Sequence, residues 1–410
     1  MIKFKWMGHA CVLIENNGIK LITDPWFGYA FHYNTFHAFP PFIKPDSDVL
    51  DKIDIIHISH IHNDHFCKQS LSFFKKDIPI AIANYKNKFF LNEIISLGFT
   101  NIIEIPEGNE GARYRNFNLK TVITPEEKNF DSALIISDID RKEHFYLNND
   151  CYISIEQFQN LKHVVARFKG CFLGYSPVNP YPTCYDNTKL KNVELSKMDV
   201  LSLIETEQRK YVEYAIKICK EFKTEWLLPY SNNLRLLNTD LFHHNRIFSD
   251  IQLFDSYQSD FLLLNDVTIG SEISESGVVL KKEKVMQEKI ENYKQIPFFE
   301  TYSDDQIHDY QSKIECSLNE FMRKVSLSWK SPMIIQFVIL GERKKIELNY
   351  HHLVENVDRD PDLIVEYRFS DLKRLCENQY SFVHLHYMFR FNAIIINYIH
   401  NQSVVHKWGL

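Results

Sequence analysis

Residues 57–66 have the sequence His57-Ile58-Ser59-His60-Ile61-His62-Asn63-Asp64-His65-Phe66, which places four metal-ligand side chains within six residues. The apolar run Ile53-Asp54-Ile55-Ile56 precedes it and predicts a buried strand. Such a strand delivers the loop to a site, and we expect a helix to begin near Phe66. A polar turn with chance histidines is the alternative, but this spacing of ligand types rarely arises by chance.

The loop can serve two metal ions. His60 and His62 lie two residues apart and can project to one side, so we expect them to bind a first ion. Asp64 and His65 can then reach a second ion beside it. The sequence therefore predicts a dinuclear metal site.

The pattern His-x-His-x-Asp-His after an apolar strand resembles the metal loop of the metallo-β-lactamase superfamily. The segments Gly8-His9-Ala10-Cys11-Val12-Leu13-Ile14-Glu15 and Leu21-Ile22-Thr23-Asp24-Pro25-Trp26 resemble that superfamily's first pair of strands. The resemblance implies an α/β fold, the αββα sandwich, and strand and helix patterns alternate through the first half as that fold requires. It also implies that Asp24 and His9 hold metal-bound histidines by hydrogen bonds; a turn at Asp24 before Pro25 is the less favoured alternative.

Length and patterning predict two domains. A chain of 410 residues is too long for one ordinary core. We expect a metal-binding domain over residues 1–275 and a C-terminal α+β module over residues 290–410. In that module we expect a helix over 307–325, strands over 333–340 and 363–369, and a helix from Ser370, an order that faintly resembles a sterol-carrier-like lid. We interpret its four histidines as packed or surface residues: His351, His352, His384 and His386.

Composition excludes several classes of protein. A formal net charge of -6 argues against a sequence-independent nucleic-acid binder, so we expect no nucleic-acid partner. The eight cysteines have no Cys-x-x-Cys spacing, which argues against a zinc knuckle or a disulfide framework. We find no basic segment followed by an apolar stretch at the start and no run near the ~20 apolar residues of a membrane span. We therefore expect a cytoplasmic protein with no membrane partner.

The segment Thr124-Pro125-Glu126-Glu127-Lys128-Asn129-Phe130-Asp131 follows a predicted strand, Phe117 to Ile123. Superfamily hydrolases usually have a third histidine in this loop, and this chain has none. The resemblance puts Glu127 at that position, with Glu126 beside it; a surface acidic turn is the alternative. A carboxylate ligand there suits iron or manganese better than hydrolytic zinc.

Two later strand ends complete the expected site. Asp150 follows the strand that begins at His144, where the superfamily has a carboxylate that bridges both metals, although a helix N-cap is the other interpretation. The strand Trp226 to Tyr230 ends without the superfamily's last histidine, but His243 and His244 follow one loop later and could bind the second ion.

Two aromatic or proline-rich segments could border the substrate. The segment Phe27 to Phe42 either packs on the body of the domain or forms one wall of a cleft. In the loop Pro177 to Tyr185, Tyr181, Thr183 and Tyr185 are candidate substrate contacts. We expect both segments to border one pocket.

A narrower resemblance rests on Pro-Tyr-Pro-Thr-Cys-Tyr (180–185), Glu-Thr-Glu-Gln-Arg-Lys (205–210) and Leu-Leu-Pro-Tyr (227–230). In order and spacing these are similar to the metallo-β-lactamase-like part of the CMP-N-acetylneuraminate hydroxylase family, from near residue 3 to about residue 270. That family hydroxylates the N-acyl methyl group of a nucleotide sugar with O2, and a Rieske domain supplies its electrons. No Cys-x-His followed by Cys-x-x-His exists in these 410 residues. The resemblance therefore implies a separate electron-donor protein, or electrons from the substrate itself.

We predict a dinuclear non-haem iron oxygenase that acts on a small or nucleotide-linked metabolite with O2 as co-substrate. His60, His62 and Glu127 would hold one iron ion; Asp64 and His65, with His243 or His244, would hold the other; and Asp150 would bridge. Asp150 and Glu127 are the candidate catalytic residues. The first alternative is a hydrolase of an ester, amide or phosphodiester bond, in which two zinc or manganese ions lower the pKa of a water to about 7. The second is a non-enzymatic scaffold with a decayed site.

Overall fold

The structure is a computed structural model of the whole chain. It describes residues 2–28, 30–31, 36–40, 42, 45–107, 111–124, 131–175, 197–232, 234–236, 245, 248–257, 260–282, 313, 316, 333–339, 342–349, 352–355, 363–367 and 391–395. The chain divides into two compact units. The first comprises Met1–Val178, Glu207–Arg235 and Phe248–Tyr293, and the second comprises Asn179–Thr206, Leu236–Ile247 and Lys294–Leu410.

An eight-stranded sheet forms one inner layer of the first unit. Its strand order is β18-β17-β1-β2-β3-β6-β7-β8. The bounds are β1 (Ile2–Gly8), β2 (Cys11–Asn16), β3 (Ile19–Thr23), β6 (Ile55–His57), β7 (Ile80–Ala83), β8 (Ile102–Ile105), β17 (Glu272–Ser274) and β18 (Val279–Lys281). The β2–β3 hairpin turns at Asn17 and Gly18, both with positive φ, as an Asn-Gly hairpin signal predicts. From β3 to β8 the strands run parallel, so their carboxyl ends share one edge.

A seven-stranded sheet forms the other inner layer, in the order β16-β14-β13-β12-β11-β10-β9. The bounds are β9 (Ala112–Tyr114), β10 (Phe117–Ile123), β11 (Ser132–Asp138), β12 (His144–Leu147), β13 (Gly170–Gly174), β14 (Trp226–Tyr230) and β16 (Leu262–Leu263). Strand β10 alternates between buried and partly buried residues, which is typical of a strand with one face on a core. Strands β12, β13, β14 and β16 are parallel, and the others are antiparallel.

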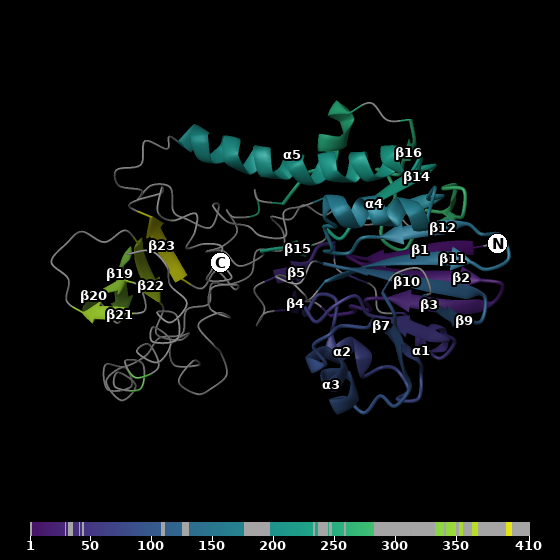
Figure 1. Cartoon of the computed structure of the whole chain (residues 1–410), viewed down its shortest axis with the longest axis horizontal. Helices are drawn as coiled ribbons and strands as arrows, with labels where there is room; N and C mark the ends of the chain where they lie inside the picture. Colours follow the sequence, from purple (N-terminus) through teal and green to yellow (C-terminus); the bar gives the residue numbers. More distant parts are fainter. Residues whose placement is uncertain are drawn as a thin grey trace. The chain divides into compact units, whose positions relative to one another are not determined.

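Helices cover the outer faces of both sheets (Figure 1). They are α1 (Ser47–Leu50), α2 (Lys68–Leu71), α3 (Phe89–Ser96), α4 (Ile155–Val164), α5 (Lys197–Glu221) and the 3-10 helix η4 (Ile251–Ser256). One apolar cluster lies between the sheets and includes Phe4, Phe145 and Trp226. A second joins the seven-stranded sheet to α4 and α5, and a third joins the eight-stranded sheet to α1, α2 and α3. This is the predicted αββα sandwich, and the predicted fold class is confirmed.

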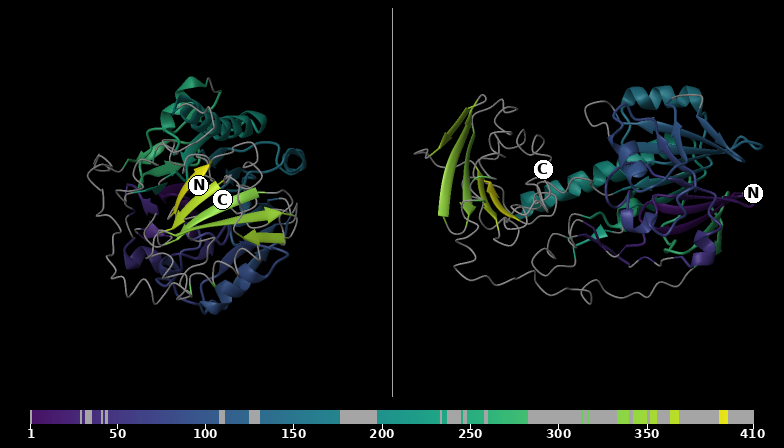
Figure 2. Two further views of the ribbon diagram at one scale, coloured as in Figure 1. Left: turned by 90° about the vertical axis from the view of Figure 1, so that its left-hand side faces the viewer. Right: turned by 90° about the horizontal axis from the view of Figure 1, so that it is seen from below.

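The described residues also form two smaller sheets. In the first unit, β15 (Leu234–Arg235) pairs with β5 (Phe36–Ala38), which pairs with β4 (Ala30–Phe31). The second unit contains a five-stranded sheet, drawn in green and yellow in Figure 2. Its strands are β19 (Met333–Ile339), β20 (Glu342–Asn349), β21 (His352–Glu355), β22 (Leu363–Tyr367) and β23 (Phe391–Ile395), in the order β21-β20-β19-β22-β23. Strands β19 and β22 fall where the sequence predicts strands, whereas the helices predicted over 307–325 and from Ser370 lie outside the described residues.

Helix α5 has 25 residues. It begins at Lys197 and includes the Glu-Thr-Glu-Gln-Arg-Lys motif of residues 205–210. Among the residues that the structure describes, no helix is both long enough and apolar enough to cross a bilayer.

Candidate metal centre

The loop after β6 lies where several strand ends meet. Strand β3 ends just before Asp24, β6 leads to His60, and β12 ends shortly before Asp150. Asp131 immediately precedes β11, which runs antiparallel to β12 and therefore begins at the same edge. The turn between β1 and β2 brings His9 to this edge, which is the end of the sandwich away from the N-terminus in Figure 1. Ligands of open α/β sheets bind at such an edge.

Four imidazoles and three carboxylates gather there. Their possible ligand atoms form three overlapping groups, each within 4.8 Å: His9, Asp64 and His65; His60, His65 and Asp150; and His60, His62 and Asp131. The two outer groups share no residue, and the middle group connects them. Such an arrangement is what two ions with one shared bridging residue would need.

Asp150 lies between two histidines of the loop. Its Oδ2 is 3.8 Å from His60 Nε2 and 3.4 Å from His65 Nε2. One carboxylate oxygen is thus close to a nitrogen from each side of the site, which is the position of a bridging ligand. The alternative interpretation of Asp150 as a helix N-cap does not hold, because Ser154 caps α4 in a capping box with Gln157.

The first side of the centre combines His60 and His62 with Asp131. His60 Nε2 lies 2.9 Å from His62 Nδ1 and 3.6 Å from Asp131 Oδ1. The two imidazole nitrogens lie within hydrogen-bond distance of each other, and their positions also suit a shared cation. Asp131 Oδ1 is buried and has no hydrogen-bond partner, so it is an acceptor that a cation could satisfy.

The second side combines His9 and His65 with Asp64. Asp64 Oδ2 is 3.1 Å from His9 Nε2 and 3.7 Å from His65 Nε2. His65 is fully buried, and its Nε2 has no hydrogen-bond partner. A buried nitrogen that faces two carboxylates and makes no bond fits a metal ligand, so these residues suit a divalent cation.

Asp24 holds the imidazoles of both sides. It is fully buried, and its Oδ2 lies 2.7 Å from His65 Nδ1 and 2.7 Å from the Ser59 hydroxyl, which donates to it. Ser59 Oγ lies 2.9 Å from His60 Nδ1. The network assigns a proton to Nδ1 of both histidines, because the Ser59 hydroxyl already donates to Asp24 and accepts from His60. With Nδ1 engaged in this way, Nε2 is the nitrogen of His60 and His65 that is directed into the site and is left to bind a cation.

Hydroxyl groups fix the loops that carry the ligands. Tyr85 and Ser132 both donate from their hydroxyls to the Ser59 carbonyl, the latter at 2.7 Å. The Tyr230 hydroxyl donates to Asn149 Oδ1 at 2.7 Å and accepts from the Asn149 backbone N–H at 3.0 Å. Asn149 adopts a positive φ of 50°, and these bonds stabilise the turn that presents Asp150.

Burial and mutual charge shift the titration of the cluster. Burial, then the neighbouring His65 and His62, holds the pKa of His60 well below its usual value. Burial alone would lower the pKa of His65, but Asp150, Asp64 and Asp24 outweigh it and raise that pKa well above its usual value. Burial raises the pKa of Asp131 to about 6. Bound cations would compensate these crowded carboxylates.

Several expected site residues lie outside the described residues: Glu126, Glu127, Tyr181, Thr183, Tyr185, His243 and His244. At the end of β14, where the superfamily has its last histidine, Ser231 contacts the ligand cluster. Its Oγ is 3.4 Å from His9 Nε2, and its backbone N–H donates to the His9 carbonyl at 3.2 Å.

The structure adds residues that the sequence analysis missed. Asp131 was not among the expected ligands, and His9 was expected only as an outer hydrogen-bond partner, whereas it lies inside a ligand group. The sequence does give a signal for His9. It lies in the short turn between two paired strands, and such a turn lies at the edge of the sheet. Asp131 had no comparable local signal, because only the pairing of β10 with β11 brings it to the site.

Part of the aromatic segment lies beside the centre. The Trp26 ring packs edge-on against His9, with 5.5 Å between ring centroids, and against Phe42, with 4.8 Å. Phe42 therefore lies on the same side of the domain as the ligand cluster, as expected of a residue that borders the substrate. Residues 176–185, the other expected wall, lie outside the described residues.

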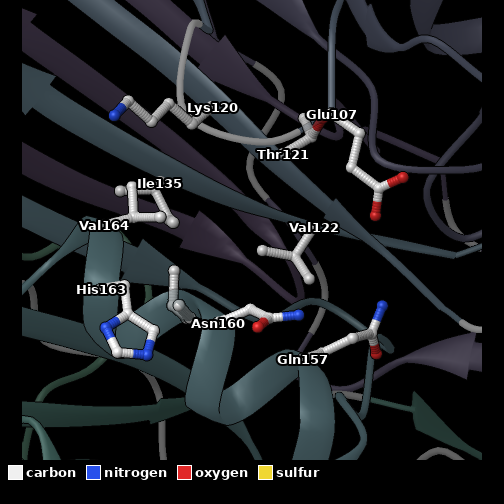
Figure 3. Close-up of a pocket in the computed structure, with 10 residues that line it drawn as sticks. Glu107, Lys120, Thr121, Val122, Ile135, Gln157, Asn160, His163 and Val164 are labelled. Atoms are coloured by element: carbon white, nitrogen blue, oxygen red, sulfur yellow. The ribbon is translucent and has the colours of Figure 1, made fainter.

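A cavity of about 410 Å³ lies away from the ligand cluster, beside β10 and α4 (Figure 3). Its lining residues are Glu107, Lys120, Thr121, Val122, Ile135, Gln157, Asn160, Leu161, His163 and Val164. None of them belongs to the ligand groups. The cavity is therefore separate from the candidate centre.

Comparison with known proteins supports this description. Residues 3–139 match the family model described as a beta-lactamase superfamily domain, a span that includes the metal loop and Asp131. Residues 3–139 therefore form a beta-lactamase superfamily domain.

Two curated relatives and one solved structure are similar to the chain. A protein of Mycolicibacterium smegmatis named as a Rieske 2Fe-2S iron-sulfur protein is 33% identical over 99 residues, 24% of this chain and 19% of the relative. The Mus musculus cytidine monophosphate-N-acetylneuraminic acid hydroxylase is 24% identical over 239 residues, 56% of this chain and 39% of the relative. The isothiocyanate hydrolase from Delia radicum gut bacteria superposes with a TM-score of 0.44 at 14% identity, over 67% of this chain and 100% of that chain. The chain spans less than half the length of the curated relatives that it matches.

Proposed function

Since residues 3–139 form a beta-lactamase superfamily domain, we propose that the chain is a cytoplasmic dinuclear non-haem iron oxygenase that hydroxylates a small or nucleotide-linked metabolite. The observation that carries this proposal is the mixed ligand cluster at the sheet edge. It holds three carboxylates, Asp64, Asp131 and Asp150, beside four imidazoles.

The donor set favours iron over a hydrolytic zinc ion. Carboxylate oxygens are harder donors than imidazole, and mixed oxygen and nitrogen coordination suits iron or manganese. Asp131 lies next to His60, in the segment where the resemblance implies a carboxylate in place of the third histidine of superfamily hydrolases. Anionic donors also stabilise the higher oxidation state of an iron pair.

The chain's own residues would hold and orient the metals. His60, His62 and Asp131 would bind one ion, and His9, Asp64 and His65 the other, with Asp150 between them. Asp24 and Ser59 keep the Nε2 lone pairs of His60 and His65 directed at the ions. The bound iron pair would supply the reduction of O2 that hydroxylation needs.

The electrons would come from outside these residues. No Rieske ligand pair exists in the chain, whereas one relative is named for a Rieske cluster. We therefore propose a separate electron-donor protein, or electrons from the substrate. The similarity to cytidine monophosphate-N-acetylneuraminic acid hydroxylases, over 56% of the chain, is what supports a nucleotide-linked substrate.

A metal-dependent hydrolase is the second candidate, and the four imidazoles of the cluster favour it, because zinc prefers nitrogen ligands. Elemental analysis and an optical spectrum of protein purified in air decide between the two. We expect two iron ions per chain, a charge-transfer absorption band, and O2 consumption when reductant and substrate are present.

His62→Ala should lose the absorption band, and the matched variant His163→Ala, at an exposed histidine on α4, should keep it. Stoichiometric zinc together with turnover of an ester, amide or phosphodiester would replace the oxygenase by the hydrolase.

A further inference from the structure

Arg235 lies near the metal-bearing edge of the seven-stranded sheet. It follows Ser231, which contacts His9, by four residues, and it pairs in register with His37 of β5. Strands β4, β5 and β15 lie at the end of the sandwich away from the N-terminus (Figure 1). Arg235, on β15, therefore lies at the same end of the domain as the strand ends that carry the ligand cluster.

Among the residues that the structure describes, the hydrogen bonds of Arg235 use a single nitrogen, Nη1. Nη1 donates to the backbone carbonyls of Asn232 at 3.0 Å and Leu234 at 2.6 Å. These two bonds hold the guanidinium plane in a fixed orientation, 5.1 Å from the centroid of the Phe248 ring. Nε and Nη2 make no hydrogen bond to the described residues. These two nitrogens form the side-on fork that binds a carboxylate or phosphate through two parallel bonds.

No carboxylate among the described residues lies within ion-pair distance of Arg235. Three other arginines show the usual pattern, since Arg115 pairs with Asp54, Arg141 with Glu275 and Arg167 with Glu225. Those three are exposed, whereas Arg235 is partly buried. A cation that is partly removed from water without a paired anion is unfavourable unless something compensates it.

Burial has more effect on Arg235 than the two negative or ionisable groups near it. Burial lowers the pKa of Arg235, and Tyr175 and Asp250 only partly oppose that effect. Tyr175 follows β13 and lies at the same edge of the sheet. The Asp250 carboxylate caps η4 by accepting a hydrogen bond from the Gln252 backbone N–H, and it acts on Arg235 through its charge without a direct ion pair.

We propose that Arg235 binds an oxyanion group, carboxylate or phosphate, of the substrate and so makes the enzyme selective for anionic substrates. This inference rests on the proposed function, because it assigns Arg235 a role in the same reaction. The fixed guanidinium would anchor the anionic end, and the rest of the substrate would extend along the sheet edge toward the metals. The aromatic face of Phe248 orients the guanidinium further.

Calorimetric titration of the iron-loaded full chain with inorganic phosphate, and separately with succinate, tests the proposal. We expect the unaltered protein to bind at least one of these anions. Arg235→Met should weaken that binding about tenfold or more, since it removes charge-assisted bonds. Arg235→Lys should recover part of the affinity, because it restores the charge but not the fork. The anion that loses more affinity in Arg235→Met identifies the preferred group.

Arg113→Met is the matched control, because Arg113 is exposed on β9. It should bind both anions as the unaltered protein does, and all variants should keep their iron content and far-ultraviolet circular dichroism. Unchanged affinity in Arg235→Met, or no binding of either anion by the unaltered protein, overturns the proposal. If Arg235→Met alone is misfolded, Arg235→Lys decides, and full affinity with full iron content in that variant contradicts a bidentate site. If the purified protein binds no iron but still binds an anion through Arg235, the oxygenase proposal is wrong and the anion site is retained.

Discussion

Replacing Asp24 by Asn tests how the hydrogen bonds behind the ligands hold the metal centre. Asp24 accepts three bonds of 2.7 Å: from the Ser59 backbone N–H, from the Ser59 hydroxyl and from His65 Nδ1. Asparagine has nearly the same size, but an NH2 group replaces one carboxylate oxygen. If its oxygen keeps the Ser59 backbone bond, its NH2 faces His65 Nδ1. His65 must then accept at Nδ1 and carry its proton on Nε2, the nitrogen that faces Asp64 and Asp150.

The size of the effect follows from this change of tautomer. Loss of an outer partner of a metal-bound histidine weakens metal affinity by about 10–100-fold, which is about 1.4–2.8 kcal/mol. Asp24→Asn both removes a partner and puts a proton on the ligand nitrogen of His65, so we expect a loss near 100-fold at the ion that His65 holds. A smaller loss should occur at the ion held by His60, which Asp24 reaches only through the Ser59 hydroxyl.

Chelator competition on iron-loaded protein, with elemental analysis at each chelator concentration, measures both losses. Asp138→Asn is the matched control, because Asp138 is also buried, accepts backbone bonds from Asp140 and Arg141, and lies at the opposite end of β11 from the site. It should destabilise the fold without changing metal affinity. Unchanged affinity of both ions in Asp24→Asn, or an equal loss in Asp138→Asn, would refute the role of Asp24.

Three further variants test other parts of the structure. His62→Ala should lose metal from at least one site, by well over the 10–100-fold typical of outer partners, and full metal content by elemental analysis would contradict the ligand assignment. Burial raises the pKa of Asp131 to about 6, so in metal-free protein its stabilising contribution is full below pH ~4 and is lost as the pH rises through 6. Urea unfolding from pH 4 to 7 should therefore show a loss of up to about 3 kcal/mol relative to Asp131→Asn, and parallel pH profiles would contradict this. Gly8→Ala should lower the free energy of unfolding by about 1–3 kcal/mol, because Gly8 has φ +118° and a Cβ there would lie 2.3 Å from the Phe42 ring. Gly18→Ala is the control and should lower it less, because Gly18 has φ +82° but open space around it.

Local patterns in the sequence predicted the fold well. The alternation of β10, the Asn17-Gly18 turn and the spacing of the metal loop each depend on neighbours in the chain, so they are visible without a structure. Ser154 and Gln157 also form a capping-box pattern, and attention to it would have removed the N-cap interpretation of Asp150.

The rest of the site depends on contacts between distant parts of the chain. Ser132 donates to the carbonyl of Ser59, 73 residues away, and Asn149 bonds to Tyr230, 81 residues away. Such pairs follow from the order of the strands in the sheet, which periodicity does not determine. The roles of Asp131 and Tyr230 could therefore not be derived from the sequence alone.

Asp131 places an oxygen donor beside His60, in the segment that lacks the third histidine of superfamily hydrolases. The segment 124–131 joins β10 to β11, and its two ends are tied together because the Thr124 backbone N–H and hydroxyl donate to the Asp131 carbonyl at 3.0 and 3.3 Å. Asp131 is therefore anchored directly beside the buried strand β11. A ligand next to a rigid element is held more accurately than one further along a loop. A carboxylate-rich centre therefore does not require Glu127, because Asp131 already places an oxygen donor beside His60 and His62.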